Sequence, residues 1–370
     1  MNQQRPRHII ISGGGTGGHI FPAISIANAL KSADPTAEIL FVGAEGRMEM
    51  DLVPAAGYRI TGLPITGLKR HRVWENAGVM VRLVKSIAMA RKIIREFRPD
   101  VVVGVGGYAS GPVLWAAGRM RIPTLIQEQN SYAGITNRLL AGKAERICVA
   151  YRGMEKYFPA SKIMLTGNPL RSSYSGLEDL AGEAVSYFNL EKGRPVVLVL
   201  GGSLGAGSIN DTVTVSADRI RAGGLQWIWQ AGKHYFEKVT SRVVTAELNY
   251  VKVKSFIDRM DLAYAAADII VSRSGAGTIS ELCLVGKPVV LVPSPNVAED
   301  HQTRNAMALV HEDAAVMLRD DEVASRLPDL VLQLSANVSR RRQLSENIRK
   351  LALPGSADTI AAEVIRMSGK

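Results

Sequence analysis

The chain has 370 residues, which exceeds an ordinary single domain and favours two domains that each bury a core. With 46% hydrophobic and 21% charged residues and only two cysteines, the composition excludes collagen, coiled coil, intrinsic disorder and a disulfide scaffold, and it fits a reducing compartment. The net charge of +11 comes from residues 1–165, which hold 22 Lys and Arg against 11 Asp and Glu, whereas the remainder is balanced.

The basic first half predicts an anionic partner, a class that includes phospholipid headgroups, nucleic acid and phosphorylated substrates. A solvated basic face without a partner is the alternative. Nucleic acid is the weaker interpretation, because the chain has no zinc-finger spacing, no aromatic RNA-binding strand motif and only 6% aromatic residues. We therefore expect no nucleic acid partner.

Short β-branched runs alternate with helical stretches along the first half, which is typical of a parallel, doubly wound sheet. A helix is predicted from about Phe21 to Lys31. The uncharged stretch Val101–Gly118 approaches transmembrane length, but its five glycines and Pro112 favour a buried strand, a glycine loop and a helix start. The predicted strands lie at His8–Ser12, Glu38–Val42, Val101–Val105, Pro123–Gln127 and Arg146–Ala150.

The same rhythm restarts in the second half, so we predict an α/β protein of two Rossmann-like domains joined near Lys162–Arg171. The tail from about Val338 to Met367 is predicted to be two helices separated by Pro354-Gly355. The expected boundaries are 1–163 for the first domain, 164–340 for the second and 341–370 for the terminal helices. The second set of strands is predicted at Pro195–Leu200, Leu225–Gln230, Tyr250–Phe256, Asp268–Ser272 and Pro288–Pro293.

Three glycine-rich turns follow predicted strands, at Gly13–His19, Gly201–Gly207 and Ser274–Thr278. The first satisfies the dinucleotide-binding pattern G-x-G-x-x-G and lacks the Lys-Ser/Thr of a phosphate-binding P-loop. Glycines let backbone approach a ligand, and helix N-termini offer free N–H groups to an anion. One such turn is also explained as a tight strand–helix connection, but three of them predict a phosphate-rich ligand in a cleft between the domains.

Eight sequence motifs, taken together and in order, resemble the MurG family of peptidoglycan N-acetylglucosaminyltransferases, within glycosyltransferase family 28. The resemblance covers nearly the whole chain, and the combination is far more specific than any one motif. The motifs are GGTGGH (Gly14–His19), GVGGYASGP (Gly104–Pro112), EQN (Glu128–Asn130), GNPLR (Gly167–Arg171), GGSLGA (Gly201–Ala206), Phe256–Asp258, RSGAGTISE (Arg273–Glu281) and EDHQTRNA (Glu299–Ala306).

This resemblance implies a GT-B fold, with two Rossmann-like parallel-sheet domains facing across a cleft and the last helix packing back on the first domain. It implies inverting transfer of GlcNAc from UDP-GlcNAc to the C4 hydroxyl of MurNAc in undecaprenyl-pyrophosphoryl-MurNAc-pentapeptide (lipid I), which gives lipid II. The family works peripherally at the cytoplasmic face of the inner membrane. Because the sequence contains no Asp-x-Asp, we expect no metal and no other cofactor, with backbone N–H groups, a helix dipole and Arg stabilising the leaving UDP.

The resemblance also assigns positions that bind UDP-GlcNAc. Ser203 and Arg171 match contacts to the diphosphate and the donor, Ile257 matches the position whose backbone meets uracil, and Gln302 matches the position reading the GlcNAc hydroxyls. Glu281 matches the ribose ligand, although a first-turn Glu that complements the helix dipole is the alternative. The remaining matched positions are Thr16, Gly17, Gly18, Asn130, Ala276, Gly277, Thr278, Ile279 and Ser280.

An inverting transfer needs one base to take the proton from the attacking hydroxyl. His19 and Glu128 are the catalytic candidates, with His19 favoured. His19 directly follows the glycine loop, where it could instead cap the helix, and Glu128 lies at a strand end, where α/β domains place functional side chains.

The segment around residues 69–98 suggests how the first half meets an anionic phospholipid surface. A stripe of apolar residues faces the core, while Trp74, Val79 and Met80 lie among basic residues, as in an interfacial anchor. Packing of these three side chains inside the domain is the alternative. The stripe consists of Leu83, Ile87, Ala90, Ile94 and Phe97, and the basic residues are Lys69, Arg70, Arg72, Arg82 and Lys85.

Three other functions remain open from the sequence. A diacylglycerol glycosyltransferase shares the donor-domain features but not the first-half motifs. An NAD-dependent oxidoreductase would need Glu45 to bind a ribose and would leave the second glycine-rich domain unexplained. A non-enzymatic membrane or nucleic-acid binding protein would have no use for Glu281 or Gln302. The oligomeric state is not given by the sequence.

Overall fold

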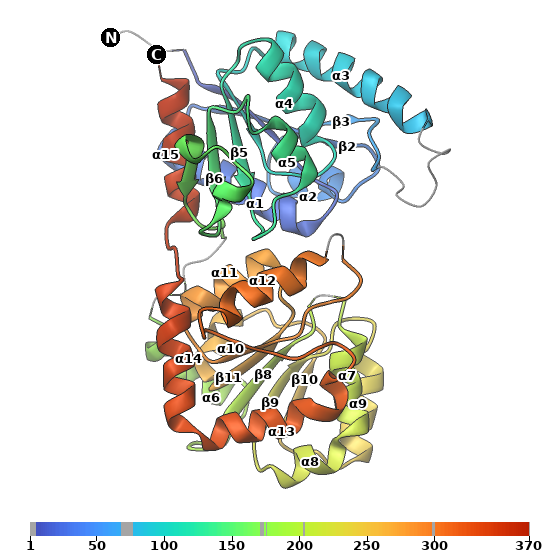
Figure 1. Cartoon of the computed structure of the whole chain (residues 1–370). Coiled ribbons are helices and arrows are strands. Elements are labelled where there is room, and N and C mark those ends of the chain that lie inside the picture. The colour runs from blue at the N-terminus through green and yellow to red at the C-terminus, as the bar shows by residue number, and fades with distance from the viewer. Residues whose placement is uncertain are drawn as a thin grey trace. The chain divides into compact units, whose positions relative to one another are not determined.

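The computed structural model describes residues 5–67, 77–170, 174, 176–202, 204–297 and 300–369. The chain divides into two compact units (Figure 1). Unit 1 is formed by Met1–Arg171 together with Leu353–Lys370, and unit 2 by Ser172–Ala352.

Unit 1 contains a seven-stranded sheet in the order β3-β2-β1-β4-β5-β6-β7, in which every pair of neighbours is parallel. The strand order reverses between β1 and β4, so the loops after these two strands meet at the place where such sheets bind ligands. The strands are β1 (His8–Ser12), β2 (Glu38–Ala44), β3 (Arg59–Leu63), β4 (Val101–Gly104), β5 (Thr124–Glu128), β6 (Arg146–Val149) and β7 (Ile163–Leu165).

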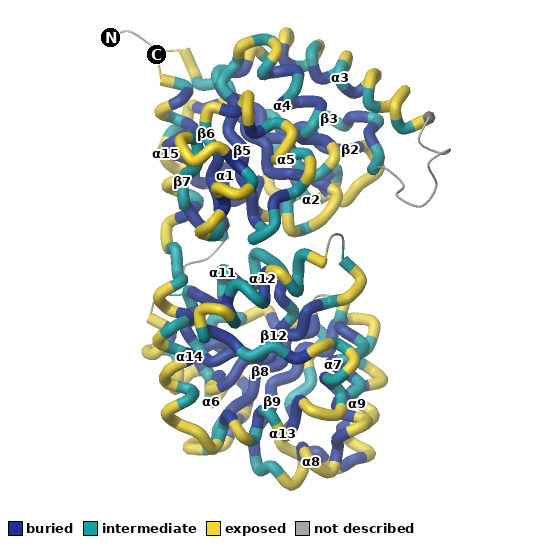
Figure 2. The backbone as a smooth tube through the Cα atoms, viewed as in Figure 1, coloured by how far each residue is buried: buried dark blue, intermediate teal, exposed yellow. Residues whose placement is uncertain are grey.

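The side chains of β1 alternate between the two faces of this sheet, as a strand requires. Ile9 and Ile11 join one core with α1 and α15, whereas Ile10 joins the opposite core with α3 and α4. Figure 2 shows the central strands as buried on both sides. The helices are α1 (Gly17–Ala33), α2 (Glu49–Ala55), α3 (Ala77–Phe97), α4 (Ser110–Arg119), α5 (Ile135–Leu140) and α15 (Ser356–Ser368).

Helix α15 belongs to unit 1 although it comes last of the described helices. It packs along α1, and the Arg146 Nε of β6 donates to the buried Glu363 Oε1 over 2.8 Å. The apolar side of α15 contributes Ile360, Ala361 and Val364 to the same core as Ile24 of α1. The fold of unit 1 is therefore completed by a segment far away in the sequence.

Unit 2 contains a six-stranded parallel sheet in the order β10-β9-β8-β11-β12-β13. Its core includes Trp227 and Trp229, whose rings lie 5.7 Å apart. The strands are β8 (Val196–Leu200), β9 (Gln226–Gln230), β10 (Val251–Lys254), β11 (Ile269–Ser272), β12 (Val289–Leu291) and β13 (Val316–Met317). The helices are α6 (Ala181–Tyr187), α7 (Gly207–Val215), α8 (Ala217–Ala222), α9 (Phe236–Thr245), α10 (Met260–Ala266), α11 (Ala276–Val285), α12 (His301–Val310), α13 (Val323–Ala336) and α14 (Val338–Lys350).

The structure differs from the predicted elements at a few places. Helix α1 begins at Gly17 rather than near Phe21, so His19 is its third residue and Thr16 occupies the N-cap position. Strands β3, β7 and β13 were not predicted, and β7 lies inside the segment that we expected to join the domains. Val101–Gly118 forms β4, a glycine loop and most of α4, as predicted. Among the described residues, no helix is both long and apolar enough to span a membrane.

Candidate active site

The glycine loop after β1 packs backbone against backbone with the loop after β4. Gly14 and Gly107 both adopt positive φ angles, of 153° and 84°. A Cβ atom at Gly107 would collide with the carbonyl oxygen of Gly14. These two motifs of the sequence therefore form one surface at the switch point of the sheet, and glycine is required there by contact as well as by conformation.

A carboxylate that the sequence analysis did not single out supports this loop. Glu49, the first residue of α2, is 1% exposed. Its Oε2 accepts a hydrogen bond from Gly15 N over 2.9 Å, and its Oε1 accepts one from Ala44 N over 3.0 Å. The available signal was an acidic residue shortly after the second strand, but helix-dipole compensation explains such a residue equally well.

His19 lies in the first turn of α1 with its ring turned back toward the glycine loop. Its Nδ1 lies 3.0 Å from the carbonyl oxygen of Gly14 and 3.2 Å from Thr16 Oγ1. Because a carbonyl oxygen can only accept, Nδ1 carries the proton in this contact, and in the neutral ring Nε2 then carries the lone pair. This tautomer suits a general base that acts through Nε2.

The N-terminus of α1 has no side-chain cap. Thr16 is an extended N-cap residue whose carbonyl accepts from His19 N over 3.1 Å and from Ile20 N over 3.2 Å. Thr16 and Gly18 are exposed and Gly17 is half-buried. Helix starts of this kind present backbone N–H groups and the positive end of the helix dipole to an anion.

Glu128, the other candidate base, is a buried residue at the end of β5 that is 2% exposed. Its Oε1 accepts from Asn130 N over 3.1 Å, and its Oε2 accepts from Gly134 N over 3.0 Å and Asn137 Nδ2 over 2.8 Å. Burial raises the pKa of the Glu128 carboxyl, while these hydrogen bonds act to lower it. The carboxyl group therefore fixes the loop that contains Asn130.

An amide network beneath this loop was also missed by the sequence analysis. Asn168, from the GNPLR motif, is 2% exposed and accepts from Gln127 Nε2 over 3.1 Å. Its own Nδ2 donates to Gln129 O over 3.1 Å, and Gln129 Nε2 donates to Val105 O over 2.6 Å. The GNPLR segment is thus anchored to the ends of β4 and β5, while Arg171 lies outside the described residues.

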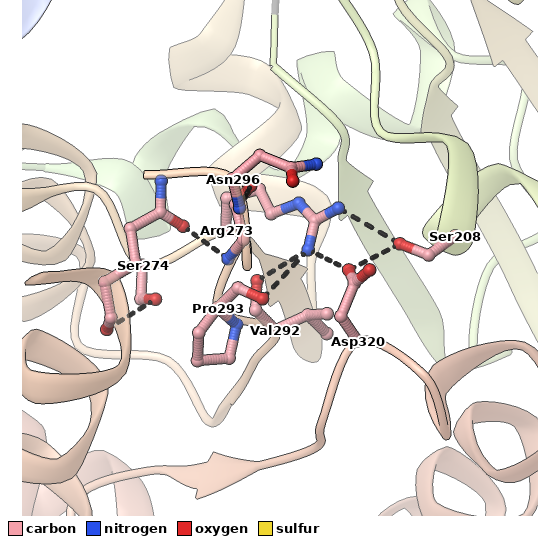
Figure 3. A network of polar contacts seen from close by, with 9 residues as sticks. Ser208, Arg273, Ser274, Val292, Pro293, Asn296 and Asp320 are labelled. Carbon is pink, nitrogen blue, oxygen red and sulfur yellow. Dashed lines mark hydrogen bonds and ion pairs between the residues drawn. The ribbon is translucent and has the colours of Figure 1, made fainter. Parts of the chain in front are cut away.

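In unit 2 the side chain of Arg273 joins the ends of several strands (Figure 3). Its Nη1 donates to Val292 O over 3.1 Å and Pro293 O over 3.2 Å, and it pairs with Asp320. Its Nη2 lies 3.0 Å from Ser208 Oγ, and that hydroxyl donates to Asp320 Oδ1 over 2.6 Å. The guanidinium group therefore fixes the loops after β11, β12 and β13 and the start of α7 relative to one another.

Glu281 lies in the second turn of α11, which begins at Ala276 after the N-cap residue Gly275. Its Oε1 accepts from Tyr174 Oη over 2.5 Å, and Tyr264 Oη lies 3.5 Å from its Oε2. Burial raises the pKa of the Glu281 carboxyl, against the effect of the two tyrosine hydroxyls. The alternative role of a first-turn residue facing the helix dipole is therefore wrong, and Tyr174 is a neighbour that the sequence did not predict.

The other predicted donor positions lie on the same loops. Ala276, Gly277 and Thr278 form the first turn of α11, which has no side-chain cap at Gly275, and these three residues and Ser280 are half-buried. The side chain of Ile279 is 1% exposed, so only its backbone is placed to meet a ligand.

Gln302 and Ile257 both form hydrogen bonds within unit 2. Gln302 Oε1 accepts from Ser294 N over 2.9 Å, and its backbone carbonyl accepts from Ser274 Oγ over 2.9 Å. Ile257 N donates to Gln230 Oε1 over 3.2 Å. Ser203 lies outside the described residues. In the part of the chain that the structure describes, no three His, Cys, Asp or Glu side chains gather as they would around a metal ion.

Two parallel-sheet units with glycine loops and helix starts at the strand ends give the chain a GT-B fold, as predicted. The family models agree: residues 9–149 match the glycosyltransferase family 28 N-terminal domain, and residues 196–360 match the glycosyltransferase family 28 C-terminal domain. The chain belongs to glycosyltransferase family 28. Membership removes the oxidoreductase and the non-enzymatic alternatives.

Similar proteins cover the full chain. A protein of Bacteroides thetaiotaomicron is 56% identical over 99% of both chains, and one of Flavobacterium psychrophilum is 49% identical over 97% of both. Both are named UDP-N-acetylglucosamine--N-acetylmuramyl-(pentapeptide) pyrophosphoryl-undecaprenol N-acetylglucosamine transferase. The crystal structure of Acinetobacter baumannii MurG matches 98% of this chain and 100% of its own, with a TM-score of 0.80 and 26% identity.

Proposed function

We propose that the enzyme transfers GlcNAc from UDP-GlcNAc to the C4 hydroxyl of MurNAc in lipid I, giving lipid II with inversion at the anomeric carbon. The observation that carries this proposal is the 56% identity, over 99% of both chains, to a relative named for that reaction. The helix starts after the glycine loops of both units support it, since neither N-cap residue forms a side-chain cap and the N-terminus of a helix favours an anion such as a pyrophosphate.

The donor is assigned to unit 2. The first turn of α11, together with Ser203, would bind the diphosphate, and the carbonyl of Ile257 would face uracil because its N–H already bonds to Gln230. Arg171, the residue of unit 1 that directly precedes unit 2, would bind the donor as well. The ribose hydroxyls would take the place of the Tyr174 hydroxyl on Glu281. Gln302 would donate from Nε2 to the GlcNAc hydroxyls, since its Oε1 is held by Ser294.

The acceptor is assigned to unit 1. The backbone of Thr16, Gly17 and Gly18 would meet the sugar and the lipid pyrophosphate, as the positive end of α1 favours. His19 Nε2 would take the proton of the C4 hydroxyl while that oxygen bonds to the anomeric carbon and the bond to UDP breaks. Glu128 would act by holding Asn130 against the donor sugar.

We assign membrane docking to the start of α3. Met80, Val81 and Val84 are exposed large apolar side chains there, next to the exposed Arg82 and Lys85. This combination suits the peripheral binding of an anionic phospholipid surface at the cytoplasmic face of the membrane. The predicted contributors Lys69, Arg70, Arg72 and Trp74 lie outside the described residues.

Transfer of radiolabelled GlcNAc from UDP-GlcNAc to a short-chain lipid I analogue, with EDTA present, tests this function. We expect a labelled lipid II product from the wild-type enzyme. Glu281→Ala should lower kcat/KM for UDP-GlcNAc roughly 10- to 100-fold, because the ribose hydroxyls lose a charged acceptor.

The matched control is Glu237→Ala, which removes an exposed carboxylate of α9 and should leave kcat/KM unchanged. Absence of transfer from UDP-GlcNAc to lipid I, together with turnover of another sugar nucleotide or another lipid, would contradict the proposed substrates. Loss of transfer in EDTA would contradict the metal-independent mechanism.

A further inference from the structure

A single peptide group, between Gly14 and Gly15, separates the buried carboxylate of Glu49 from the imidazole of His19. The N–H of this peptide donates to Glu49 Oε2 over 2.9 Å. Its carbonyl oxygen lies 3.0 Å from His19 Nδ1. In a trans peptide the N–H and C=O point in opposite directions, so fixing one of them fixes the other.

Neither Gly14 nor Gly15 has a side chain that could fix the orientation of this peptide. Gly14 and Gly15 have φ angles of 153° and 84°, and such residues are free to choose among many backbone conformations. A Cβ atom at Gly14 would collide with the Glu49 carboxylate, so Glu49 fills the space beside the loop. Glu49 therefore holds the N–H side of this peptide, while Gly107 lies against its carbonyl side.

A carboxylate suits this position better than an amide. Glu49 accepts two backbone N–H groups, from Gly15 and from Ala44, and only a group with two acceptor oxygens satisfies both. Its charge also polarises the peptide, because hydrogen bonds in a chain strengthen one another. The Gly14 carbonyl thereby becomes a stronger acceptor for the Nδ1 proton of His19.

We infer that Glu49 is a positioning residue for His19, which it orients through the Gly14–Gly15 peptide. The relay keeps the proton on Nδ1 and the lone pair on Nε2. A carboxylate that bonds directly to a catalytic histidine does the same, but here the backbone carries the effect. The inference rests on the proposed function in so far as His19 is the base of the transfer reaction.

Substitution of Glu49 by glutamine tests the relay with little change in shape. The amide keeps one acceptor and turns its NH2 group toward the other backbone N–H, so one of the two bonds is lost. We expect kcat to fall about tenfold, by more than any rise in KM for UDP-GlcNAc, because a misdirected base slows proton transfer without removing donor contacts.

The tautomer of His19 is the readout that a merely structural role would not change. In protein labelled with ¹⁵N-histidine, the His19 ring signals are identified by their absence in His19→Gln. We expect the wild type to show the Nδ1–H form and Glu49→Gln to show a mixture with the Nε2–H form.

The matched control is Glu363→Gln, which alters another buried carboxylate of unit 1 that bonds to Arg146 and Arg366. It should lower the unfolding temperature and leave both the tautomer and kcat unchanged. An unaltered His19 tautomer in Glu49→Gln, or equal losses of kcat in the two variants, would overturn the inference. A wild type with the Nδ1–H form and no transfer would overturn the proposed function instead and leave the relay intact.

Discussion

At the switch point of unit 1, individual residues position one another through backbone contacts. Gly107 touches the carbonyl of Gly14, Glu49 binds Gly15, and His19 binds back to Gly14. These contacts place the imidazole through the backbone of the glycine loop. Precision at this site therefore depends on the exact path of a few glycines, and their substitution should affect activity and stability together.

Gly107→Ala provides a direct test. The added methyl group would collide with the backbone of Gly14, and the alanine would also have to adopt a φ of 84°. Neither loop can move away without breaking its backbone contacts. We expect the free energy of unfolding to fall by about 2 kcal/mol or more, with loss of transfer activity. Denaturant unfolding and the transfer assay measure the two effects. Gly142→Ala is the control, since a Cβ there would meet nothing within 4 Å, and equal stability of the two variants would contradict the close approach.

Residues with a recognisable motif were predictable, and residues that act across the fold were not. RSGAGTISE located the start of α11, and GGTGGH located the glycine loop before α1, although that helix begins four residues earlier than predicted. Glu49 and Tyr174 belong to no such motif, and their importance follows only from contacts that join distant segments, such as the bond between Tyr174 and Glu281. The sequence contains no local signal for a contact of this kind.

At the scale of elements, side chains from the ends of strands tie the loops of unit 2 together. Arg273 joins the loops after β11, β12 and β13, and Ser274 bonds to the first turn of α12. The loops that we assign to donor binding are therefore held in place by charged and polar contacts. The predicted strands correspond to β8–β12, whereas β13 is only two residues long and half-buried, which leaves too short a pattern to recognise.

Arg273→Lys should loosen this scaffold. A lysine ammonium lacks the planar fork that reaches two carbonyls, Asp320 and Ser208 at once. We expect the free energy of unfolding of unit 2 to fall by about 1–3 kcal/mol and KM for UDP-GlcNAc to rise. Arg319→Lys, which alters an exposed pair with Asp321, should change neither quantity. If Arg273→Lys changed neither the free energy of unfolding nor KM, the loops would not depend on the Arg273 contacts for their positions.

The attachment of α15 to β6 should depend on pH. Hydrogen bonding to Arg366 and Arg146 holds the pKa of Glu363 below its usual value, although burial opposes this shift. The unfolded chain then binds the proton more readily, so the contribution to stability is present above the ordinary pKa of glutamate and is lost as the pH falls below it. We expect the difference in unfolding temperature between the wild type and Glu363→Gln to shrink from pH 7 to pH 4. A constant difference would contradict this account.

For the whole molecule, the uneven distribution of charge agrees with the exposed apolar residues of α3. The excess of Lys and Arg lies in residues 1–165, and Met80, Val81 and Val84 are exposed in the same unit. The overall fold was predictable because two separate strand–glycine–helix patterns each signalled a parallel sheet. Strand β3 was not, because its sequence RITGL contains no continuous apolar run, and β7 was not, because its apolar run is only three residues long.

Binding to vesicles tests the proposed membrane surface. The double variant Met80→Ser, Val84→Ser should bind roughly tenfold more weakly to vesicles that contain anionic phospholipid. It removes two apolar side chains that would insert into the lipid. Val244→Ser with Val338→Ser is the control, since both valines are exposed in unit 2. Equal binding by the two double variants would place the contact elsewhere. Raising the salt concentration should weaken wild-type binding.

The packing of α15 on α1 has a consequence for how the protein is made. A ribosome releases α1, with its glycine loop and His19, before all of unit 2, and it releases α15 only afterwards. Until then the apolar side of α1 that receives Ile360 and Val364 lies bare. Unit 2 can fold as soon as it emerges, but unit 1 must wait. A chain cut short before α15 would therefore carry every proposed site residue and still lack a complete core in unit 1.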